Sequence, residues 1–433
     1  MRRRDFLRQG AVGLSLTVAP LIIPRRVLAG PEGPGANDRI HIGLIGPGGR
    51  AHSLLDESPK DVRLVALADC DLRQCRKYNK WVAEKRPDLA TEKLPHYQDY
   101  RAMFEKEKLD AAIVATTTHA RALICIHSMQ AGLDVYSEKP LTLTIEEGQY
   151  LVRAEQRYQR ILQVGTQQRS VPIDNFGSDL VKNGALGKVH TVLCANFVGP
   201  EQWKPSEGET VPEELNWDMW CHQTELVPYT KNLHPGLDKW GKWRAYDGGG
   251  LSFGVTGWGT HAFDQVQRAL GTDDTTPTEV RFLEDPGPNA KVSLHYASGV
   301  VVKCEYGLEE GPGLGGIFIG EKGRLEINRN KLVSDPPELI NGAPEPDDKA
   351  IYASVAGPHL QNWVDCMRTR QKPNASAEVG HNSSVICHLI NIARELGRPL
   401  KWDPAAESFV GDEEANALRS RPRRKGYELP VIS

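Results

Sequence analysis

Short apolar runs alternate with amphipathic segments over the first part of the chain. Four such runs stand out, at residues 39–45, 62–68, 110–116 and 134–138. Between the last two, residues 121–132 place Leu123, Ile126 and Met129 on one helical face. Strands that alternate with helices form a parallel sheet with helices packed on it. We therefore expect an α/β, Rossmann-like, doubly wound parallel sheet domain over residues 38–165.

From residue 166 onward the pattern changes to β-rich runs. These are residues 188–197, 291–296, 300–306, 316–321 and 324–329. Short turn segments such as 297–299 and 322–323 join several of them, which favours antiparallel neighbours. Helical periodicity returns over residues 359–397. We expect an α+β domain with an open, mostly antiparallel sheet over residues 166–420, which binds substrate and forms the oligomer, and then a tail at 421–433.

Residues 200–250 interrupt this pattern with a long segment that has no clear periodicity, and loops of this length are usually functional or disordered. The tryptophans of this segment favour an ordered structure. They are Trp203, Trp217, Trp220, Trp240 and Trp243. Aromatic faces beside hydrogen-bonding groups suit a carbohydrate. The alternative for any single tryptophan is packing against the others.

The first 30 residues have the pattern of an export signal. Arg3, Arg4, Phe6 and Leu7 follow the RRxFL order of a twin-arginine signal, and a short apolar run follows. That run is too brief to span a bilayer, so we expect no stable membrane insertion. An ordinary secretory signal is the alternative. We predict export to the periplasm and a signal peptide at residues 1–30.

Charge and cysteine content exclude several classes of partner. The net charge is −3, which gives no electrostatic footprint for nucleic acid. We interpret the basic residues at 419–426 as a solvated surface. The 8 cysteines are scattered without a CxxC or zinc-type spacing, so we expect buried thiols and no metal site.

A glycine-rich turn follows the first strand. Gly46, Gly48 and Ala51 fill the G-x-G-x-x-(G/A) pattern, in which small residues allow the tight turn, the approach of a pyrophosphate and close helix packing. Asp69 ends the second strand, where an acid binds the adenosine ribose; Asp71 is the weaker alternative. An acid there favours NAD over NADP, because it would repel a 2′-phosphate.

Several segments resemble one family. Glu138, Lys139 and Pro140 form an EKP motif after a strand, preceded by ATTTHARAL and followed by VGTQQRS, and WGTHAFDQVQRALG comes later. Together these resemble the Gfo/Idh/MocA family of NAD(P)-dependent sugar and cyclitol oxidoreductases, and the carboxy-terminal segments are similar to an exported bacterial subgroup. The resemblance implies a small carbohydrate substrate and a homo-oligomer, a dimer or tetramer.

The resemblance also implies roles for individual residues. Lys139 and His261 would be catalytic, with the Lys139 ammonium stabilising alkoxide character and His261 acting as the acid or base. The predicted cofactor-binding residues are Gly46, Gly48, Gly49, Arg50, Asp69, Thr116, His119, Glu138, Lys139 and Gln168. The predicted substrate-binding residues are Arg169, Trp243, Arg244, Tyr246 and His261.

One position departs from the family pattern. The dehydrogenases of the family carry D-x-x-x-H, and here Gly257 stands where the acid would be. Three interpretations follow: a dehydrogenase whose acid comes from elsewhere; a glycoside-cleaving enzyme that retains and recycles NAD through oxidation, elimination and re-reduction; and an exported binding protein without catalysis, in which His261 is a capping or core residue.

Overall fold

The computed structural model describes most of the chain. The described residues are 39–90, 93–204, 206–234, 244–246, 254–307, 310–329, 331–346 and 356–432. The predicted export signal and the predicted substrate residue Trp243 lie outside them, as does Trp240.

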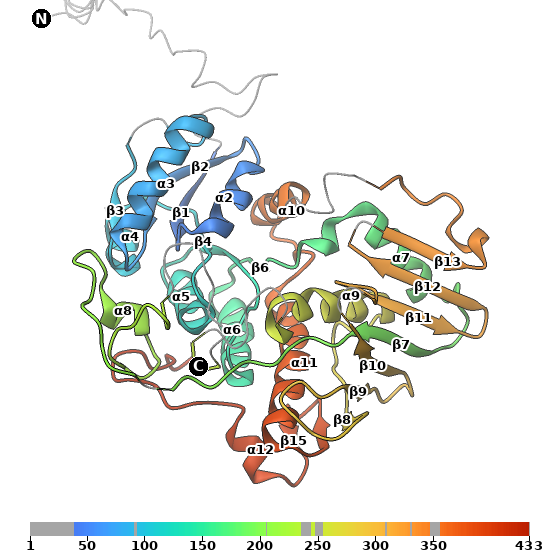
Figure 1. Ribbon diagram of the computed structural model, residues 1–433. Helices are drawn as coiled ribbons and strands as arrows, with labels where there is room; N and C mark the ends of the chain where they lie inside the picture. The colour runs from blue at the N-terminus through green and yellow to red at the C-terminus, as the bar shows by residue number, and fades with distance from the viewer. Residues whose placement is uncertain are drawn as a thin grey trace, which may run out of the picture. The chain divides into compact units, whose positions relative to one another are not determined.

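The first sheet has six parallel strands in the order β3-β2-β1-β4-β5-β6, with helices on both faces (Figure 1). The strands are β1 (Ile40–Ile45), β2 (Val62–Ala68), β3 (His96–Tyr97), β4 (Ala111–Val114), β5 (Asp134–Ser137) and β6 (Leu162–Val164). The helices are α2 (Gly49–Asp56), α3 (Leu72–Lys85), α4 (Tyr100–Lys106), α5 (Thr118–Gln130) and α6 (Ile145–Tyr158). This order is that of dinucleotide-binding domains, so the predicted fold class is confirmed.

Two strands of this sheet escaped prediction. β3 and β6 are only two and three residues long. Runs this short show no readable period, and their pairing with β2 and β5 forms them.

Apolar side chains fill both faces of the sheet. On one face, α2 and α3 pack with the later helix α10 (Ala356–Thr369), whose Trp363 is fully buried. On the other face, α4, α5 and α6 contribute residues such as Met103, Ile124 and Leu151. The chain therefore returns to the first sheet before it forms residues 400–409, the last two strands of the second sheet.

The second sheet has nine strands in the order β13-β12-β11-β7-β10-β9-β8-β14-β15. Among the strand pairs in the described residues, β7 and β10 are parallel and the others are antiparallel, as expected. The strands are β7 (Val189–Ala195), β8 (Glu279–Phe282), β9 (Val292–His295), β10 (Val301–Tyr306), β11 (Gly316–Gly320), β12 (Gly323–Asn328), β13 (Lys331–Asp335), β14 (Leu400–Asp403) and β15 (Ser408–Phe409). β8, β13, β14 and β15 were not predicted.

Helices cover one face of this second sheet. α7 (Pro172–Lys182), α9 (Thr260–Leu270) and α11 (Ala377–Leu396) share one core with the inward residues of the strands. Shorter elements complete the described chain: η3 (Gln167–Ser170), α8 (Trp217–Cys221), η4 (Val255–Gly259), η5 (Pro337–Ile340) and α12 (Glu413–Ala417).

The tryptophans of the inserted segment mostly pack against other aromatic rings. Trp217 and Trp220 are stacked with ring centroids 4.5 Å apart, and Tyr246 stacks on Trp220 at 5.6 Å. Leu215, Val227 and Leu233 join them in one buried cluster. The packing alternative is therefore confirmed for Trp217 and Trp220.

The interpretation of residues 419–426 as a solvated surface is wrong for two arginines. Arg423 forms an ion pair of 2.8 Å with the fully buried Glu147. Arg421 donates to the Ala245 carbonyl over 2.6 Å. A run of charges looks solvent-exposed in a sequence, but here buried acceptors on α6 and the inserted segment hold it.

The described part of the chain contains 8 cysteines, which are all free thiols and are buried except for the half-buried Cys70. Within it, no helix is long and apolar enough to cross a bilayer, and no group of His, Cys, Asp and Glu side chains could hold a metal ion.

Candidate active site

The turn after β1 is shaped for close approach. Gly46 has φ +80°, and a Cβ there would lie 2.8 Å from the Thr116 backbone nitrogen, so only glycine fits. α2 begins at Gly49, next to Gly48, and no side chain caps it. The amino-terminal end of α2 is therefore open toward an anion such as a pyrophosphate.

The neighbouring strand ends offer polar groups to the same edge. Asp69 follows β2; burial raises its pKa to about 7, although its carboxylate accepts a hydrogen bond of 2.8 Å from the Asp71 backbone. Asp71 is less available, because it caps α3 and binds Arg73. The Thr116 hydroxyl is buried without a hydrogen-bond partner among the described residues. An open helix end, a half-exposed acid and an unsatisfied hydroxyl fit a dinucleotide.

Glu138 and Lys139 follow β5 at the same edge. Burial raises the pKa of Glu138, but the charges of Arg50 and Lys139 outweigh it, and the result lies below the ordinary value. The Arg50 guanidinium binds the Glu138 carboxylate over 2.8 Å. Burial lowers the pKa of Lys139 to about 7, which gives this amine a proton that exchanges near neutral pH.

His261 is the second residue of α9, and α9 directly follows the π-helical turn η4. π-turns are rare and often occur at functional sites. The His261 side chain is 4% exposed, and its Nδ1 has no hydrogen-bond partner within the described residues. Burial, with the charges of Lys139 and Arg329, lowers its pKa well below the ordinary value. His261 is therefore neutral at physiological pH.

The two predicted catalytic residues come together across the domains. Lys139 Nζ donates to the Gly257 carbonyl oxygen over 3.4 Å, one helical turn before His261. The position at which the family's dehydrogenases carry an acid thus supplies a backbone oxygen instead. An amine with a shifted pKa and an unsatisfied imidazole meet where dinucleotide-binding sheets bind their ligands.

Other predicted residues have contacts that point to structural roles. His119 is fully buried, and its two ring nitrogens lie 2.6 Å from the carbonyl oxygens of Tyr246 and Trp220. Burial lowers its pKa to about 4. The Tyr246 hydroxyl donates to the Glu225 carbonyl. His119 and Tyr246 thus join α5 to the inserted segment, and their contacts do not support the predicted cofactor and substrate roles.

The two residues of η3 are also engaged. Arg169 is buried between Asp264, at 2.8 Å, and Asp273, at 2.7 Å. Gln168 donates to the Leu314 carbonyl over 2.9 Å, and its own oxygen is buried without a described partner. Arg169 therefore fastens α9 to η3, which does not support its predicted substrate role, whereas Gln168 keeps an acceptor available. Arg244 pairs with Glu395 on α11, a contact that involves neither Lys139 nor His261.

Arg329 is a residue that sequence reasoning missed. It follows β12, and its charge lowers the pKa of both Lys139 and His261. Burial lowers its own pKa to about 10, and its Nε has no hydrogen-bond partner in the described part of the chain. Its place at the end of the predicted strand at residues 324–329 did not indicate a functional role, since only folding of the second sheet brings it near Lys139.

Comparisons with known proteins agree with this geometry. A family model described as an oxidoreductase family, NAD-binding Rossmann fold, matches residues 40–166. Another, described as an oxidoreductase family, C-terminal alpha/beta domain, matches residues 178–429.

Two curated relatives match part of the chain. The myo-inositol 2-dehydrogenase of Thermotoga maritima is 27% identical over 44% of this chain and 54% of its own length. A glycosyl hydrolase family 109 protein of Shewanella pealeana is 24% identical over 54% of this chain and 53% of its own. The match thus spans about half the length of either relative.

A solved structure covers more of the chain. The WlbA dehydrogenase of Bordetella pertussis, in complex with NADH and UDP-GlcNAcA, covers 86% of this chain and 99% of its own with a TM-score of 0.60 and 17% identity. At that identity the likeness shows the fold alone.

Proposed function

This chain belongs to the Gfo/Idh/MocA family of oxidoreductases, and on that premise we propose that it moves hydride between a sugar, sugar-derivative or cyclitol hydroxyl carbon and a nicotinamide dinucleotide. The chain is an NAD(P)-dependent oxidoreductase by its family and relatives. The observation that carries the substrate-side proposal is the 3.4 Å contact from Lys139 to Gly257. It brings the amine of the first domain to the segment that bears His261.

We propose NAD as the preferred dinucleotide. Gly46, Gly48 and the open end of α2 would hold the pyrophosphate, and Asp69 would accept hydrogen bonds from the adenosine ribose. A 2′-phosphate would meet the Asp69 carboxylate. Arg73, four residues after Asp69, binds Asp71 through hydrogen bonds of 2.8 and 2.6 Å, so its charge is already paired.

The chain's own residues would manage the proton. A nicotinamide ring, when bound, supplies the hydride acceptor or donor. Lys139, with its pKa lowered to about 7 by burial, has a substantial neutral fraction that accepts the hydroxyl proton. His261 stays neutral and orients the hydroxyl through a hydrogen bond. We therefore assign proton exchange to Lys139 and orientation to His261, which reverses the division of roles expected from the sequence.

A second candidate reaction is glycoside cleavage with a retained, recycled NAD. Gly257 favours it, because no carboxylate stands beside Lys139 at that position to support simple turnover. The similarity to a glycosyl hydrolase family 109 protein points the same way. An exported enzyme would also meet no pool of exchangeable NAD.

One experiment separates the two reactions. Purified protein is denatured, and the supernatant is analysed for NAD(H) by absorbance and chromatography. Reduction of added NAD by a free sugar or cyclitol supports the dehydrogenase and excludes obligate recycling. Stoichiometric bound cofactor, together with release of sugar from an aryl glycoside and no net NADH, supports recycling and excludes the dehydrogenase.

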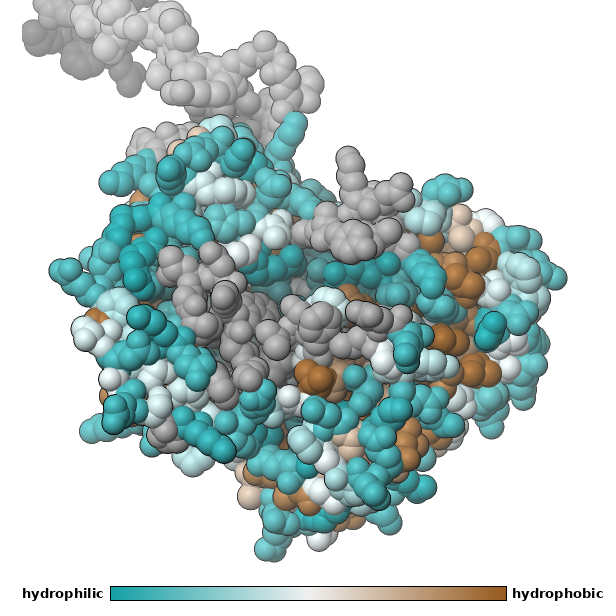
Figure 2. Space-filling model, in the orientation of Figure 1, coloured by the Kyte–Doolittle hydropathy of each residue, from teal (hydrophilic) through white to brown (hydrophobic). Residues whose placement is uncertain are grey.

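We also propose that the protein forms a homo-oligomer through the second sheet. The face opposite α7, α9 and α11 presents half-buried Leu193, Ile317 and Val301, and Ile317 pairs directly with Leu193. Figure 2 shows apolar side chains gathered near β11, β12 and β13. Light scattering after size exclusion should give a dimer or tetramer, and Ile317→Lys should shift it toward the monomer.

Export through the twin-arginine route is our proposal for residues 1–30. Such a route carries a protein already folded around its cofactor, which suits either reaction. Cell fractionation should find the protein in the periplasm, and replacing Arg3 and Arg4 by Lys should retain it inside the cell.

A further inference from the structure

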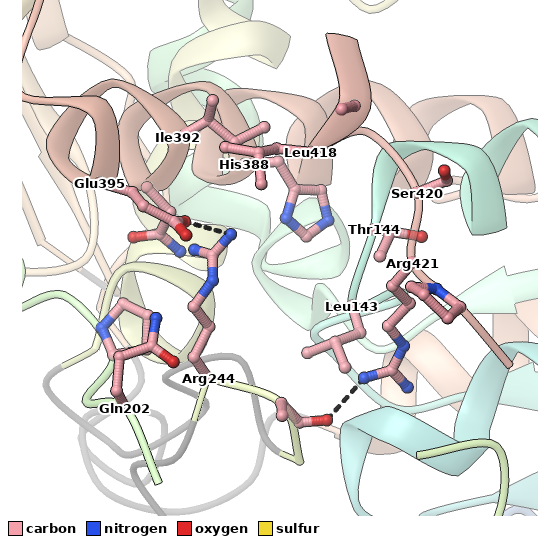
Figure 3. Close-up of a pocket in the computed structure, with 15 residues that line it drawn as sticks. Leu143, Thr144, Gln202, Arg244, His388, Ile392, Glu395, Leu418, Ser420 and Arg421 are labelled. Carbon is pink, nitrogen blue, oxygen red and sulfur yellow. Dashed lines mark hydrogen bonds and ion pairs between the residues drawn. The ribbon is translucent and has the colours of Figure 1, made fainter. Parts of the chain in front are cut away.

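A cavity lies beside α11 and the start of α6. Its volume is about 350 Å³, at the low end of the range for small-molecule sites. Four segments enclose it: the start of α6, the inserted segment at residues 200–202 and 244–245, α11, and residues 417–422 (Figure 3). None of its lining residues belongs to the nucleotide turn or to the predicted catalytic pair.

Two arginines approach this cavity from different sides (Figure 3). Arg244 is neutralised by its ion pair with Glu395 on α11. Arg421 contacts the Ala245 carbonyl through Nη1, whereas its Nε and Nη2 are buried without a hydrogen-bond partner in the described part of the chain. A buried guanidinium with two unsatisfied donors favours an anionic ligand, since a carboxylate accepts two parallel hydrogen bonds from it.

The other polar side chains that line the cavity include His388 and Asn391. His388 bonds to Thr142 over 3.1 Å, and burial lowers its pKa to about 3, so it stays neutral. The charged lining residues are therefore two arginines and one glutamate, which leave one positive charge. The Asn391 side-chain oxygen is buried without a described hydrogen-bond partner. An acceptor of this kind needs a donor such as a hydroxyl.

We infer that this cavity binds a small hydroxylated carboxylate of the sugar-acid class, with its carboxylate on Arg421 and a hydroxyl on Asn391. The carboxylate neutralises the excess charge, and the hydroxyl satisfies the amide oxygen. The apolar side chains of Leu143, Ile392 and Leu418 line the same cavity and suit the C–H faces of a sugar chain. This site is separate from the proposed oxidation and does not depend on it.

The test is calorimetric titration of the full-length protein, as purified, with D-gluconate. One saturable site is expected, with D-glucose and inorganic phosphate each binding at least about 10-fold more weakly, because each lacks one of the two groups recognised. Equal affinity for phosphate would show a simple anion site, and equal affinity for glucose would remove the role of Arg421. Either result overturns the inference, as does no binding of gluconate.

Variants locate the site. Arg421→Gln should weaken gluconate binding by about 10-fold or more, and Asn391→Leu, which leaves Arg421 in place, by several-fold. Arg424→Gln is the matched control: this arginine binds Asp218, outside the cavity, and its loss should leave affinity unchanged. Lys139→Met should also bind normally. If Lys139→Met abolishes binding while Arg421→Gln and Asn391→Leu do not, gluconate occupies the catalytic cleft and the inference fails.

Discussion

The surroundings of His119 and His261 differ, although both imidazoles are buried and neutral. Both nitrogens of His119 meet carbonyl oxygens at 2.6 Å, and the ring packs against Trp220 and Tyr246. The Nδ1 of His261 has no such partner among the described residues. The Lys139 amine, whose pKa is lowered, contacts the Gly257 carbonyl one turn before His261. Burial therefore does not distinguish a structural histidine from a functional one here; hydrogen-bond satisfaction does.

This difference has a physical basis. A buried polar atom without a partner costs stability, so it persists where something else is gained, such as a ligand that completes it. In the region around His119, whichever ring nitrogen carries the proton has a carbonyl acceptor within the protein. The region around Lys139 and His261 leaves the His261 Nδ1 for a substrate, and variants of the two regions should fail in different ways.

The largest effect should come from the catalytic pair. Lys139→Met should lower turnover by about 100- to 10,000-fold, because the proton-exchanging amine is lost. His261→Ala should lower it by about 10- to 100-fold through loss of one hydrogen bond to the reacting hydroxyl. Steady-state kinetics measure both. Bound nucleotide and the melting temperature should stay close to those of the parent; full turnover in either variant would contradict the assigned roles.

The buried ion pair between Arg169 on η3 and Asp264 on α9 should affect stability and not turnover. Arg169→Met leaves Asp264 as an unpaired buried charge, so the free energy of unfolding should fall by about 3–5 kcal/mol in urea titration. Arg268→Met provides the matched control on α9. The Arg268 guanidinium lies 3.3 Å from the carboxylate of Asp179, whose side chain is 57% exposed. The loss in the free energy of unfolding should therefore stay below about 1 kcal/mol. Similar losses in both variants would argue against the structural role of Arg169.

Replacement of His119, which is bonded within the protein, should lower stability. His119→Phe removes the one hydrogen bond that the neutral ring donates to the Tyr246 or the Trp220 carbonyl, and we expect a loss of about 1–3 kcal/mol in the free energy of unfolding. His261→Ala should cost less in the same titration, because its Nδ1 makes no described hydrogen bond. A larger loss for His261→Ala would reverse the comparison of the two regions.

The pH dependence of turnover should report Lys139. Because burial lowers its pKa to about 7, the oxidation rate should rise by about 10-fold per pH unit below that value, as the ammonium loses its proton, and then level off. His261 cannot produce this limb, since its pKa lies well below the ordinary value. A Lys139→Arg variant should lose the limb; an unchanged profile would place the titrating group elsewhere.

Dinucleotide choice should give the smallest effect. Asp69→Ser should reduce the preference for NAD over NADP by about 10-fold, because one charge-assisted hydrogen bond and one repulsion are removed. Asp71→Asn should leave the preference unchanged, since that side chain caps α3 and binds Arg73. Comparison of kcat/KM for the two dinucleotides measures both variants.

The first domain was largely predictable because its signals are local. Apolar runs of four to seven residues predicted β1, β2, β4 and β5. Gly46 indicated the turn after β1, because no other residue tolerates φ +80° against the Thr116 backbone. The strands β3 and β6 gave no such signal, because pairing with a neighbour forms runs that short.

The chain's sequence by itself determined the doubly wound sheet and the glycine turn, since steric limits and apolar periodicity act between near neighbours. The candidate pair Lys139 and His261 came instead from the resemblance of the EKP and WGTHAFDQVQRALG segments to the family. Only the tertiary structure decided that Lys139 reaches Gly257, that Arg169 and His119 are bonded within the protein, and that the Nε atoms of Arg329 and Arg421 are buried. These outcomes depend on contacts between segments more than 90 residues apart, such as Arg169 with Asp264. Desolvation and pairing at such distances follow from packing, which no local pattern encodes.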